Sequence, residues 1–242
     1  MVARSDLATD LQVVADLAHV RAGTAYFRRV LNGLTDEELS GPTLLAGWNR
    51  KHLVAHVGYN ARALARLVQW ASTGVKTPMY ESPDARGVEI EFGATLNAEA
   101  LRHLCEHSAI DLDVKWRDLP PDRWAYDVVT AQGRTVPASE TIWLRIREVW
   151  LHSIDLDAGG RISDVPDEVL GRLLGDVVRT WSSRQAIVGL LVSPDGGPSL
   201  GDSGASNEVS GSLRDLARWA TGRGDDSGLS WTQRPVPAPR WI

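Results

Sequence analysis

The stretch ETIWLRIREVWLHSIDLDAGG, residues 140–160, predicts one long helix followed by an abrupt stop. Apolar residues fill most of it, and Pro137 with Ser139 as an N-cap marks the expected start of the helix. Gly159 and Gly160 suit a left-handed C-cap, so the helix should end at this pair. The pattern of the chain changes after the two glycines, which therefore also mark the expected boundary between two domains.

Three further helices are expected before this one. Apolar side chains recur at helical spacing over residues 7–31 and again over residues 50–71, and a third helix should run from Asn97, its N-cap, to about Trp116. Residues 75–96 contain several prolines and glycines and are expected to form a long connection. Four long amphipathic helices within residues 1–160 predict a four-helix bundle.

The remainder, residues 161–242, predicts a small α+β domain. One helix is expected from Asp164 to about Ser182 and another from Ser212 to Thr221, with Ser212 and Asp215 in the positions of a capping box. The expected strands are residues 186–192, 208–210 and 229–232, and a small hairpin is expected at residues 126–136 of the first domain. The predicted fold class is therefore α+β, a helical bundle followed by a small mixed domain.

The composition is that of an ordinary globular protein, with 43% hydrophobic and 24% charged residues. A net charge of −5 argues against nucleic acid as a partner. The single cysteine, Cys105, excludes a disulfide within the chain and a cysteine-rich zinc module, and it favours a reducing cytoplasm. No segment approaches the roughly 20 apolar residues that a membrane helix needs, and the charged N-terminal residues do not resemble a signal peptide. We expect a cytoplasmic protein without a membrane partner.

The histidines form candidate metal half-sites. Four residues advance about 6 Å along a helix and turn only about 40° around it, so two ligands at this spacing can point at one centre. Three pairs have the spacing: His52 with His56, His103 with His107, and Glu148 with His152.

Glu148 with His152 is the strongest of these pairs. Both residues lie among apolar neighbours, where a carboxylate and an imidazole are costly unless they are paired, protonated or bound to a metal. Asp155 could accept the second ring hydrogen of His152 and fix its tautomer. His56 sits one turn deeper in its helix than His52 and could complete a site of two histidines and one carboxylate, which leaves positions open for water or substrate. A helix-surface pair without metal remains the alternative.

The other reactive side chains have simpler interpretations. His52 lies at a helix start and is expected to be solvated, as are His103 and His107 beside charged residues. His19 is expected to be a bystander. Cys105 lies next to leucines and is expected to be a buried small hydrophobe, so any reacting thiol should come from outside the chain.

Two motifs resemble a known family. Residues 47–57, GWNRKHLVAHV, are similar to the signature of the DinB-like, mycothiol-dependent superfamily, in which a histidine follows a Gly-Trp pair by eight positions. Residues 148–156, EVWLHSIDL, resemble its second motif, and residues 213–223, ending ATGR, resemble its small second domain. The likeness spans most of the chain. It departs from the family at Asn49, where Thr or Ser is usual, and around His52, where an acidic residue is usual.

The resemblance implies a divalent metal, expected to be Zn²⁺, held by His56, Glu148 and His152, with open positions for a small-molecule substrate and for the sulfur of mycothiol. A metal-bound thiol is deprotonated and becomes a good nucleophile near neutral pH. The implied reaction is the cis–trans isomerisation of maleylpyruvate to fumarylpyruvate in gentisate catabolism, by thiolate addition, bond rotation and elimination. The small second domain is expected to close over the cleft.

Two arginines are candidates for catalysis. The substrate is a dianion, and the enolate formed on addition needs positive charge nearby. Arg223, in the terminal Gly-Arg pair of the resemblance, is the first candidate and Arg218 the second. A structural alternative for Arg223 is a cation that complements the dipole at a helix C-terminus. Arg145 and Arg147 are expected to be local ion-pair partners.

Two other functions remain open. A mycothiol-dependent S-transferase acting on electrophiles would use the same three ligands, so the ligands do not distinguish it from an isomerase. A non-catalytic ligand-binding module is the alternative from a different class, and an intact ligand set argues against it. A purely structural metal is disfavoured because three ligands leave the coordination shell open.

Overall fold

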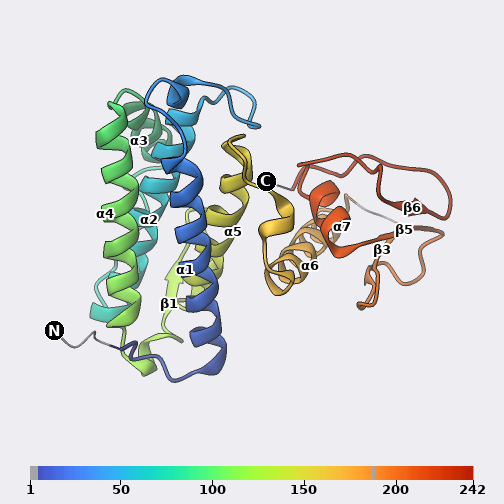
Figure 1. Cartoon of the computed structure of the whole chain (residues 1–242). Helices are drawn as coiled ribbons and strands as arrows, with labels where there is room; N and C mark the ends of the chain where they lie inside the picture. Colours follow the sequence, from blue (N-terminus) through green and yellow to red (C-terminus); the bar gives the residue numbers. More distant parts are fainter. Residues whose placement is uncertain (1–4, 187–188, 242) are drawn as a thin grey trace. The chain divides into compact units, whose positions relative to one another are not determined.

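Four long helices organise the N-terminal part of the computed structural model, which describes residues 5–186 and 189–241. In Figure 1 the four run side by side, and α2 packs against α4 and α5 while α1 packs against α5. On the sides where these helices face one another, apolar residues such as Leu17, Leu64 and Ile142 are fully buried. The helices are α1 (Leu11–Asn32), α2 (Arg50–Thr73), α4 (Ala98–Arg117) and α5 (Glu140–Asp155).

The chain forms two compact units, Met1–Gly160 and Arg161–Ile242, so the division falls at the glycine pair. Both units contain helices and strands, and the fold class is α+β. In the described part of the chain no helix is both long and apolar enough to cross a membrane.

Polar side chains cap the start of several of these helices. Asn97, the predicted N-cap of α4, accepts a hydrogen bond from the amide of Ala100 at 2.8 Å. Helix α1 begins at Leu11 rather than at the expected residue 7, because the Asp10 side chain accepts from the amides of Gln12 and Val13. The predicted N-cap Ser139 is wrong, because its backbone is already helical (φ −57°, ψ −31°) and its side chain makes no capping hydrogen bond. An N-cap needs an extended backbone for its side-chain oxygen to reach back to the helix amides.

The end of α5 also differs from the prediction. The left-handed residue that follows the helix is Asp157 (φ 48°), two positions before the left-handed Gly159 (φ 92°). Gly160 is needed for a different reason, because a Cβ there would lie 2.1 Å from the carbonyl oxygen of Ser153. Gly160 is therefore required by its close contact with α5, whereas Gly159 is required by its left-handed backbone, and neither is the residue that caps the helix.

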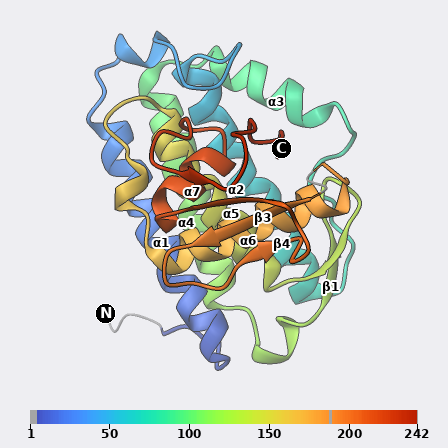
Figure 2. The same cartoon turned by 90° about the vertical axis from the view of Figure 1, so that its right-hand side faces the viewer.

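A helix that the sequence did not predict, α3 (Ala85–Ala94), lies within the expected connection 75–96. Figure 2 shows it running at an angle to the long helices. Its glycines suggest a loop, yet Gly93 packs so closely on α2 that a Cβ would lie 2.6 Å from the Cβ of Ala55. Ile90 is buried on the same side. A contact between helices thus fixes a segment whose local sequence favours a loop.

The remaining elements of the first unit are short. The predicted hairpin is confirmed as β1 (Asp127–Val129) paired antiparallel with β2 (Thr135–Pro137), and its turn contains the left-handed Gly133 (φ 77°). Two 3₁₀ turns also occur, η1 (Glu38–Ser40) and η2 (Pro121–Arg123).

The second unit contains two α-helices and a four-stranded sheet. The strand order is β4-β3-β5-β6, with β3 and β5 parallel and the two outer pairs antiparallel. Trp219 makes edge contacts with Trp181 and Trp231. Trp181 and Trp219 are buried in the core of this unit, and Trp231 is half-buried beside them. Its elements are η3 (Ile162–Asp164), α6 (Asp167–Ser183), β3 (Leu190–Pro194), β4 (Leu200–Gly201), β5 (Asn207–Gly211), α7 (Leu213–Ala220) and β6 (Ser230–Trp231).

Most predicted elements of this unit are present. Ser212 is confirmed as the N-cap of α7, since its side chain accepts from the Asp215 amide at 3.1 Å. The Asp215 carboxylate accepts from the Ser212 hydroxyl at 2.6 Å, not from the Ser212 amide as in a full capping box. Strand β4 was not predicted, because it lies in a stretch rich in Gly, Pro and Ser. Two residues of the expected strand 186–192, Ile187 and Val188, lie outside the described residues.

Replacing Gly23 with Ala should destabilise the first unit by about 1–3 kcal/mol, because the core there has no room for another methyl group. A Cβ at Gly23 would lie 2.6 Å from both Nε1 of Trp150 and Cγ2 of Val149. Urea unfolding of the variant measures the effect. Gly87→Ala is the control, since nothing lies within 4 Å of a Cβ there. Equal stability of Gly23→Ala and the wild type would show that α1 and α5 do not pack this closely.

Candidate metal centre

The loop before α2 ties the start of that helix to the end of α5. The amide of Leu44 donates to the carbonyl of Asp155 at 3.0 Å. The guanidinium of Arg50 donates to the carbonyls of Leu156 and Asp157, both at 2.7 Å. Asn49 accepts from the amide of His52 at 3.1 Å, so it caps α2 in the position where a Thr or Ser is usual in the resembling family. These bonds hold two helix ends together next to the candidate ligands.

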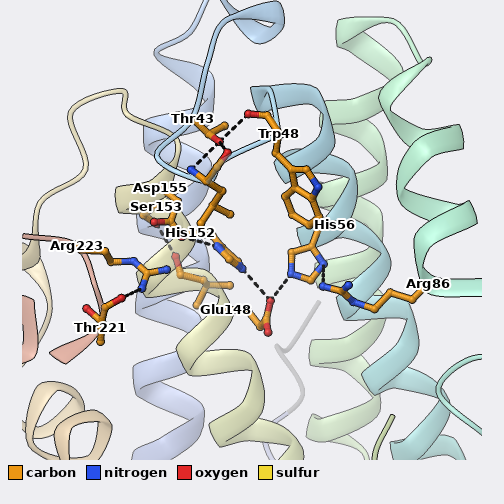
Figure 3. Close-up of polar contacts among 12 residues, drawn as sticks. Thr43, Trp48, His56, Arg86, Glu148, His152, Ser153, Asp155, Thr221 and Arg223 are labelled. Carbon is orange, nitrogen blue, oxygen red and sulfur yellow. Dashed lines mark hydrogen bonds and ion pairs between the residues drawn. The ribbon is translucent and has the colours of Figure 1, made fainter. Parts of the chain in front are cut away.

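His56 on α2 meets Glu148 and His152 on α5 at this junction. Oε2 of Glu148 lies 2.8 Å from Nε2 of His56 and 3.2 Å from Nε2 of His152. One donor atom from each residue lies within 4.8 Å of the others. Figure 3 shows the three side chains pointing toward one another. The structure therefore brings together the three residues that the resemblance names as ligands, in the number and chemistry of an open divalent-metal site.

The histidines are buried, at 5% exposure for His56 and 8% for His152. The side chain of Glu148 keeps 23% of its surface exposed, yet its Oε2 atom is shielded from solvent. No donor among the described residues reaches that oxygen with the geometry of a hydrogen bond. A shielded carboxylate oxygen of this kind is costly unless positive charge lies beside it, and a divalent cation held by these three side chains would supply that charge. The residues present fit a divalent metal.

The pKa values of the three groups differ in direction. Burial lowers the pKa of His56, and the attraction of Glu148 offsets this only in part. Burial also opposes the charge on His152, but its contacts with the Asp155 and Glu148 carboxylates outweigh this effect and raise its pKa. Burial would raise the pKa of Glu148, but the two histidines lower it well below its ordinary value. The metal-free centre therefore favours a carboxylate beside a protonated His152.

Asp155 orients His152 as the sequence predicted. Its Oδ2 lies 2.8 Å from Nδ1 of His152, and Asp155 itself is fully buried. A carboxylate at Nδ1 keeps the proton on that atom, so Nε2 is the atom free to bind a metal.

The predicted role of Arg145 as a local ion-pair partner is wrong. This residue is buried at 2% exposure and donates to the carbonyl of Val57 at 2.7 Å and to Oδ1 of Asn60 at 2.9 Å. Both acceptors lie on α2 within four residues of His56. The distance along the chain between Arg145 and these partners explains why local sequence did not reveal the contact. Arg145 holds the two ligand-bearing helices in register.

Trp48 and Arg86 both lie beside His56. The ring of Trp48, the tryptophan of the Gly-Trp pair, lies 5.4 Å from that of His56. A guanidinium nitrogen of Arg86 lies 3.4 Å from Nδ1 of His56. Burial raises the pKa of Tyr80 to about 12, and the charges of Arg86 and Glu148 also act on it. The sequence did not single out Arg86 or Tyr80, because both lie in the segment expected to be a connection.

The other histidines lie outside this cluster. His103 and His107 are exposed and stack on each other with ring centroids 5.6 Å apart. His52 is half-buried and contacts Asn49 and Glu91.

The single cysteine is also apart from the ligands. Cys105 is buried and donates to the carbonyl of Val54 at 3.1 Å. Burial raises its pKa to about 12, so its thiolate is scarce at neutral pH.

The two candidate arginines belong to the second unit. Arg223 is half-buried just after α7 and donates to the carbonyl of Thr221 at 2.9 Å. Such a contact near a helix end is also what the structural interpretation of Arg223 expects. Arg218, on α7, lies 3.4 Å from both the Asp225 carboxylate and the Ser227 hydroxyl. Arg218 therefore has a local role in holding the loop that follows α7.

Known proteins resemble the chain over most of its length. The family model described as the mycothiol maleylpyruvate isomerase N-terminal domain matches residues 20–157. The crystal structure of a mycothiol-dependent maleylpyruvate isomerase is 44% identical, covers 95% of this chain and 97% of its own, and superposes with a TM-score of 0.90. A histidine-to-alanine variant of that enzyme matches with the same identity and coverage and a TM-score of 0.89. No curated protein gives a significant match.

Metal binding should release a proton and strengthen as the pH rises. The raised pKa of His152 keeps its ring protonated to a higher pH than that of free histidine, and Nε2 must lose its proton to bind a metal. Below this pKa the apparent affinity should therefore increase by up to about tenfold per pH unit. Calorimetric titration with Zn²⁺ in buffers of different ionisation enthalpy measures both quantities.

Asp155→Asn is the comparison variant for this measurement. Loss of the carboxylate removes a contact that raises the pKa of His152, so the variant should release fewer protons and bind metal about 10- to 100-fold more weakly. Equal proton release by the two proteins would contradict the assigned role of Asp155.

Proposed function

Because the chain belongs to the mycothiol maleylpyruvate isomerase family, we propose that it converts maleylpyruvate to fumarylpyruvate with mycothiol as its thiol cofactor. The observation that carries the proposal is the cluster of His56, Glu148 and His152, in a chain that is 44% identical over nearly its whole length to an enzyme with this activity. The family resemblance of residues 47–57 and 148–156, which contain the three ligands, implies the same reaction.

The proposed metal centre uses His56, Glu148 and His152 as ligands, on a DinB-like four-helix bundle formed by the long helices of the first unit. Zn²⁺ is the metal we favour, because two imidazoles and one carboxylate are common zinc ligands at catalytic sites. When bound, the metal and mycothiol supply a thiolate, whose reversible addition to the cis double bond leaves a single bond free to rotate before elimination.

The chain's own groups prepare the centre for this chemistry. Asp155 holds the Nδ1 proton of His152 and so directs Nε2 toward Glu148. The indole of Trp48 lies beside the His56 ring and limits the access of water to it. Cys105, with a pKa near 12 and a hydrogen bond to Val54, offers no competing thiolate. An external thiol is thus the nucleophile that the centre requires.

We propose Arg223 as the group that stabilises the enolate formed during isomerisation, with Arg218 as the weaker candidate. Negative charge that develops on the substrate needs a donor or cation aimed at it. Arg223 donates to the carbonyl of Thr221 and lies just after α7. Arg218 faces the Asp225 carboxylate, so its charge is partly neutralised. We propose that the second unit closes over the metal centre and brings Arg223 to it.

We place this reaction in gentisate catabolism, in the cytoplasm, with small molecules as the only partners. A lone cysteine is typical of proteins that work in a reducing compartment. The net charge of −5 disfavours binding to nucleic acid.

His152→Ala should lose metal and isomerase activity together while the bundle stays folded. The assay follows the conversion of maleylpyruvate spectroscopically, with and without mycothiol, on protein whose bound metal has been quantified. Circular dichroism and unfolding of the same sample report the fold. His103→Ala is the matched control, since this histidine is exposed and lies outside the cluster. A metal-free His152→Ala protein with full activity would refute the site assignment.

The same assay separates the proposed function from its alternative. Wild-type protein that binds metal but does not isomerise maleylpyruvate would move the function to mycothiol S-transfer. Wild-type protein without any metal affinity would favour a ligand-binding module.

Arg223→Ala should keep its metal but lose turnover. Removal of a group that stabilises an oxyanion typically lowers kcat by about 10²- to 10³-fold. Metal analysis and steady-state kinetics on one preparation measure both effects. Arg214→Ala is the control, because this arginine is exposed on the same unit and pairs with Asp167. Normal turnover by Arg223→Ala would show that Arg223 does not stabilise the enolate.

A further inference from the structure

Arg86 places a positive charge beside the metal ligands. It lies in the first turn of α3, and one terminal nitrogen is 3.4 Å from Nδ1 of His56. Figure 3 shows it on the side of the His56 ring away from Glu148. The carboxylates of Glu148 and Glu89 are engaged by histidines and by Arg66. Within residues 5–186 and 189–241, no carboxylate lies within ion-pair distance of the Arg86 guanidinium.

The packing of α3 on α2 fixes this position. Ile90 and Gly93 follow Arg86 by four and seven residues, so the three lie on one face of the helix. Ile90 is buried, and Gly93 contacts Ala55, the neighbour of His56. The side of α3 that docks on α2 therefore carries Arg86 to the metal centre.

The second ring nitrogens of the two histidines face opposite kinds of group. Nδ1 of His152 faces a carboxylate, whereas Nδ1 of His56 faces the guanidinium of Arg86. A neutral histidine that binds a metal through Nε2 carries its proton on Nδ1. Arginine has only donors and cannot accept that proton. Arg86 therefore does not orient a metal-bound His56, and its charge remains available to an anion.

The segment just before α3 is fastened to α2. Met79 is buried and accepts through its carbonyl from Arg66 at 2.5 Å. This contact helps to hold the start of α3, and with it Arg86, against α2.

We propose that Arg86 binds one carboxylate of the substrate next to the metal ligands. The inference rests on the proposed function and deepens it, because a substrate dianion needs cationic partners for two carboxylates. A guanidinium presents paired donors that match a carboxylate oxygen for oxygen. Arg86 is thereby a determinant of specificity for dicarboxylates, supplied entirely by the first unit.

The test measures the binding of maleate, a cis-dicarboxylate, to the full-length Zn²⁺-loaded protein by calorimetry. Arg86→Gln should weaken maleate binding by about 10- to 100-fold, the range expected for loss of a charged hydrogen bond. Arg86→Lys keeps the charge but not the paired donors, so its affinity should lie between those of Arg86→Gln and the wild type. In kinetics, Arg86→Gln should raise KM for maleylpyruvate more than it lowers kcat.

Arg62→Gln is the matched control for the loss of one charge. Arg62 is also exposed, but it points from α2 toward Ser108 on α4, with a hydrogen bond of 3.2 Å. This variant should bind maleate and metal like the wild type.

Three outcomes would overturn the inference. They are unchanged maleate affinity in a metal-loaded Arg86→Gln protein, loss of metal from Arg86→Gln but not from Arg62→Gln, and a metal-loaded wild type that binds no maleate. Binding of maleate that depends on Arg86, in a wild type that fails to isomerise maleylpyruvate, would support the carboxylate site and refute the proposed function instead.

Discussion

The contact of one shielded carboxylate oxygen with imidazole rings from two helices is the constraint on which the first unit depends. Oε2 of Glu148 lies between Nε2 of His56 on α2 and Nε2 of His152 on α5. A charge shielded from water is tolerated only when groups of opposite charge stay at short range. A slip of α2 along α5 by one residue would move the His56 ring away from the oxygen, whereas His152 lies on the same helix as Glu148. The relative position of the two helices must therefore be fixed more tightly than apolar packing alone requires.

Two arginines provide that additional fixation, at different levels along the helices. Arg50 ties the first turn of α2 to the carbonyls that end α5. Arg145 crosses from α5 to Val57 and Asn60 of α2, a turn away from His56. Hydrogen bonds have strict distance and angular requirements, so they fix one position of α2 along α5. Apolar side chains can pack in several such positions, because they have no comparable requirements. The polar framework is thus part of how the ligands are positioned.

Local sequence contained enough information for the long helices and for one half of the candidate site. Helical spacing put Glu148 and His152 on one face, and the position of Asp155 three residues later implied its contact with His152. Spacing could not by itself choose between His56 and His52, and the choice of His56 rested on its greater depth in the helix. The structure has His56 beside Glu148, whereas His52 contacts Asn49 and Glu91 at the helix start.

Other features depend on contacts between segments far apart in the chain. Helix α3 docks on α2 with Gly93 against Ala55, whereas a glycine in isolation predicts a loop. Arg86 reaches His56 only as a result of that docking. The partners of Arg145 lie more than eighty residues away, so its short-range sequence neighbours misleadingly suggested a local ion pair. Helix propensity and residue spacing describe one helix at a time. These contacts depend on which helices pack against each other in the tertiary structure, and local sequence does not contain that information.

The environment of Cys105 has a consequence for chemistry that uses an external thiol. This cysteine is the only one in the chain, and its sulfur is enclosed between α2 and α4 with a pKa near 12. Alkylating reagents and oxidants react with thiolates, so they should consume an added small-molecule thiol long before they modify the protein. Mixed disulfides with the cofactor are disfavoured for the same reason. The protein can therefore bind a reactive thiol compound without exposing a thiol of its own.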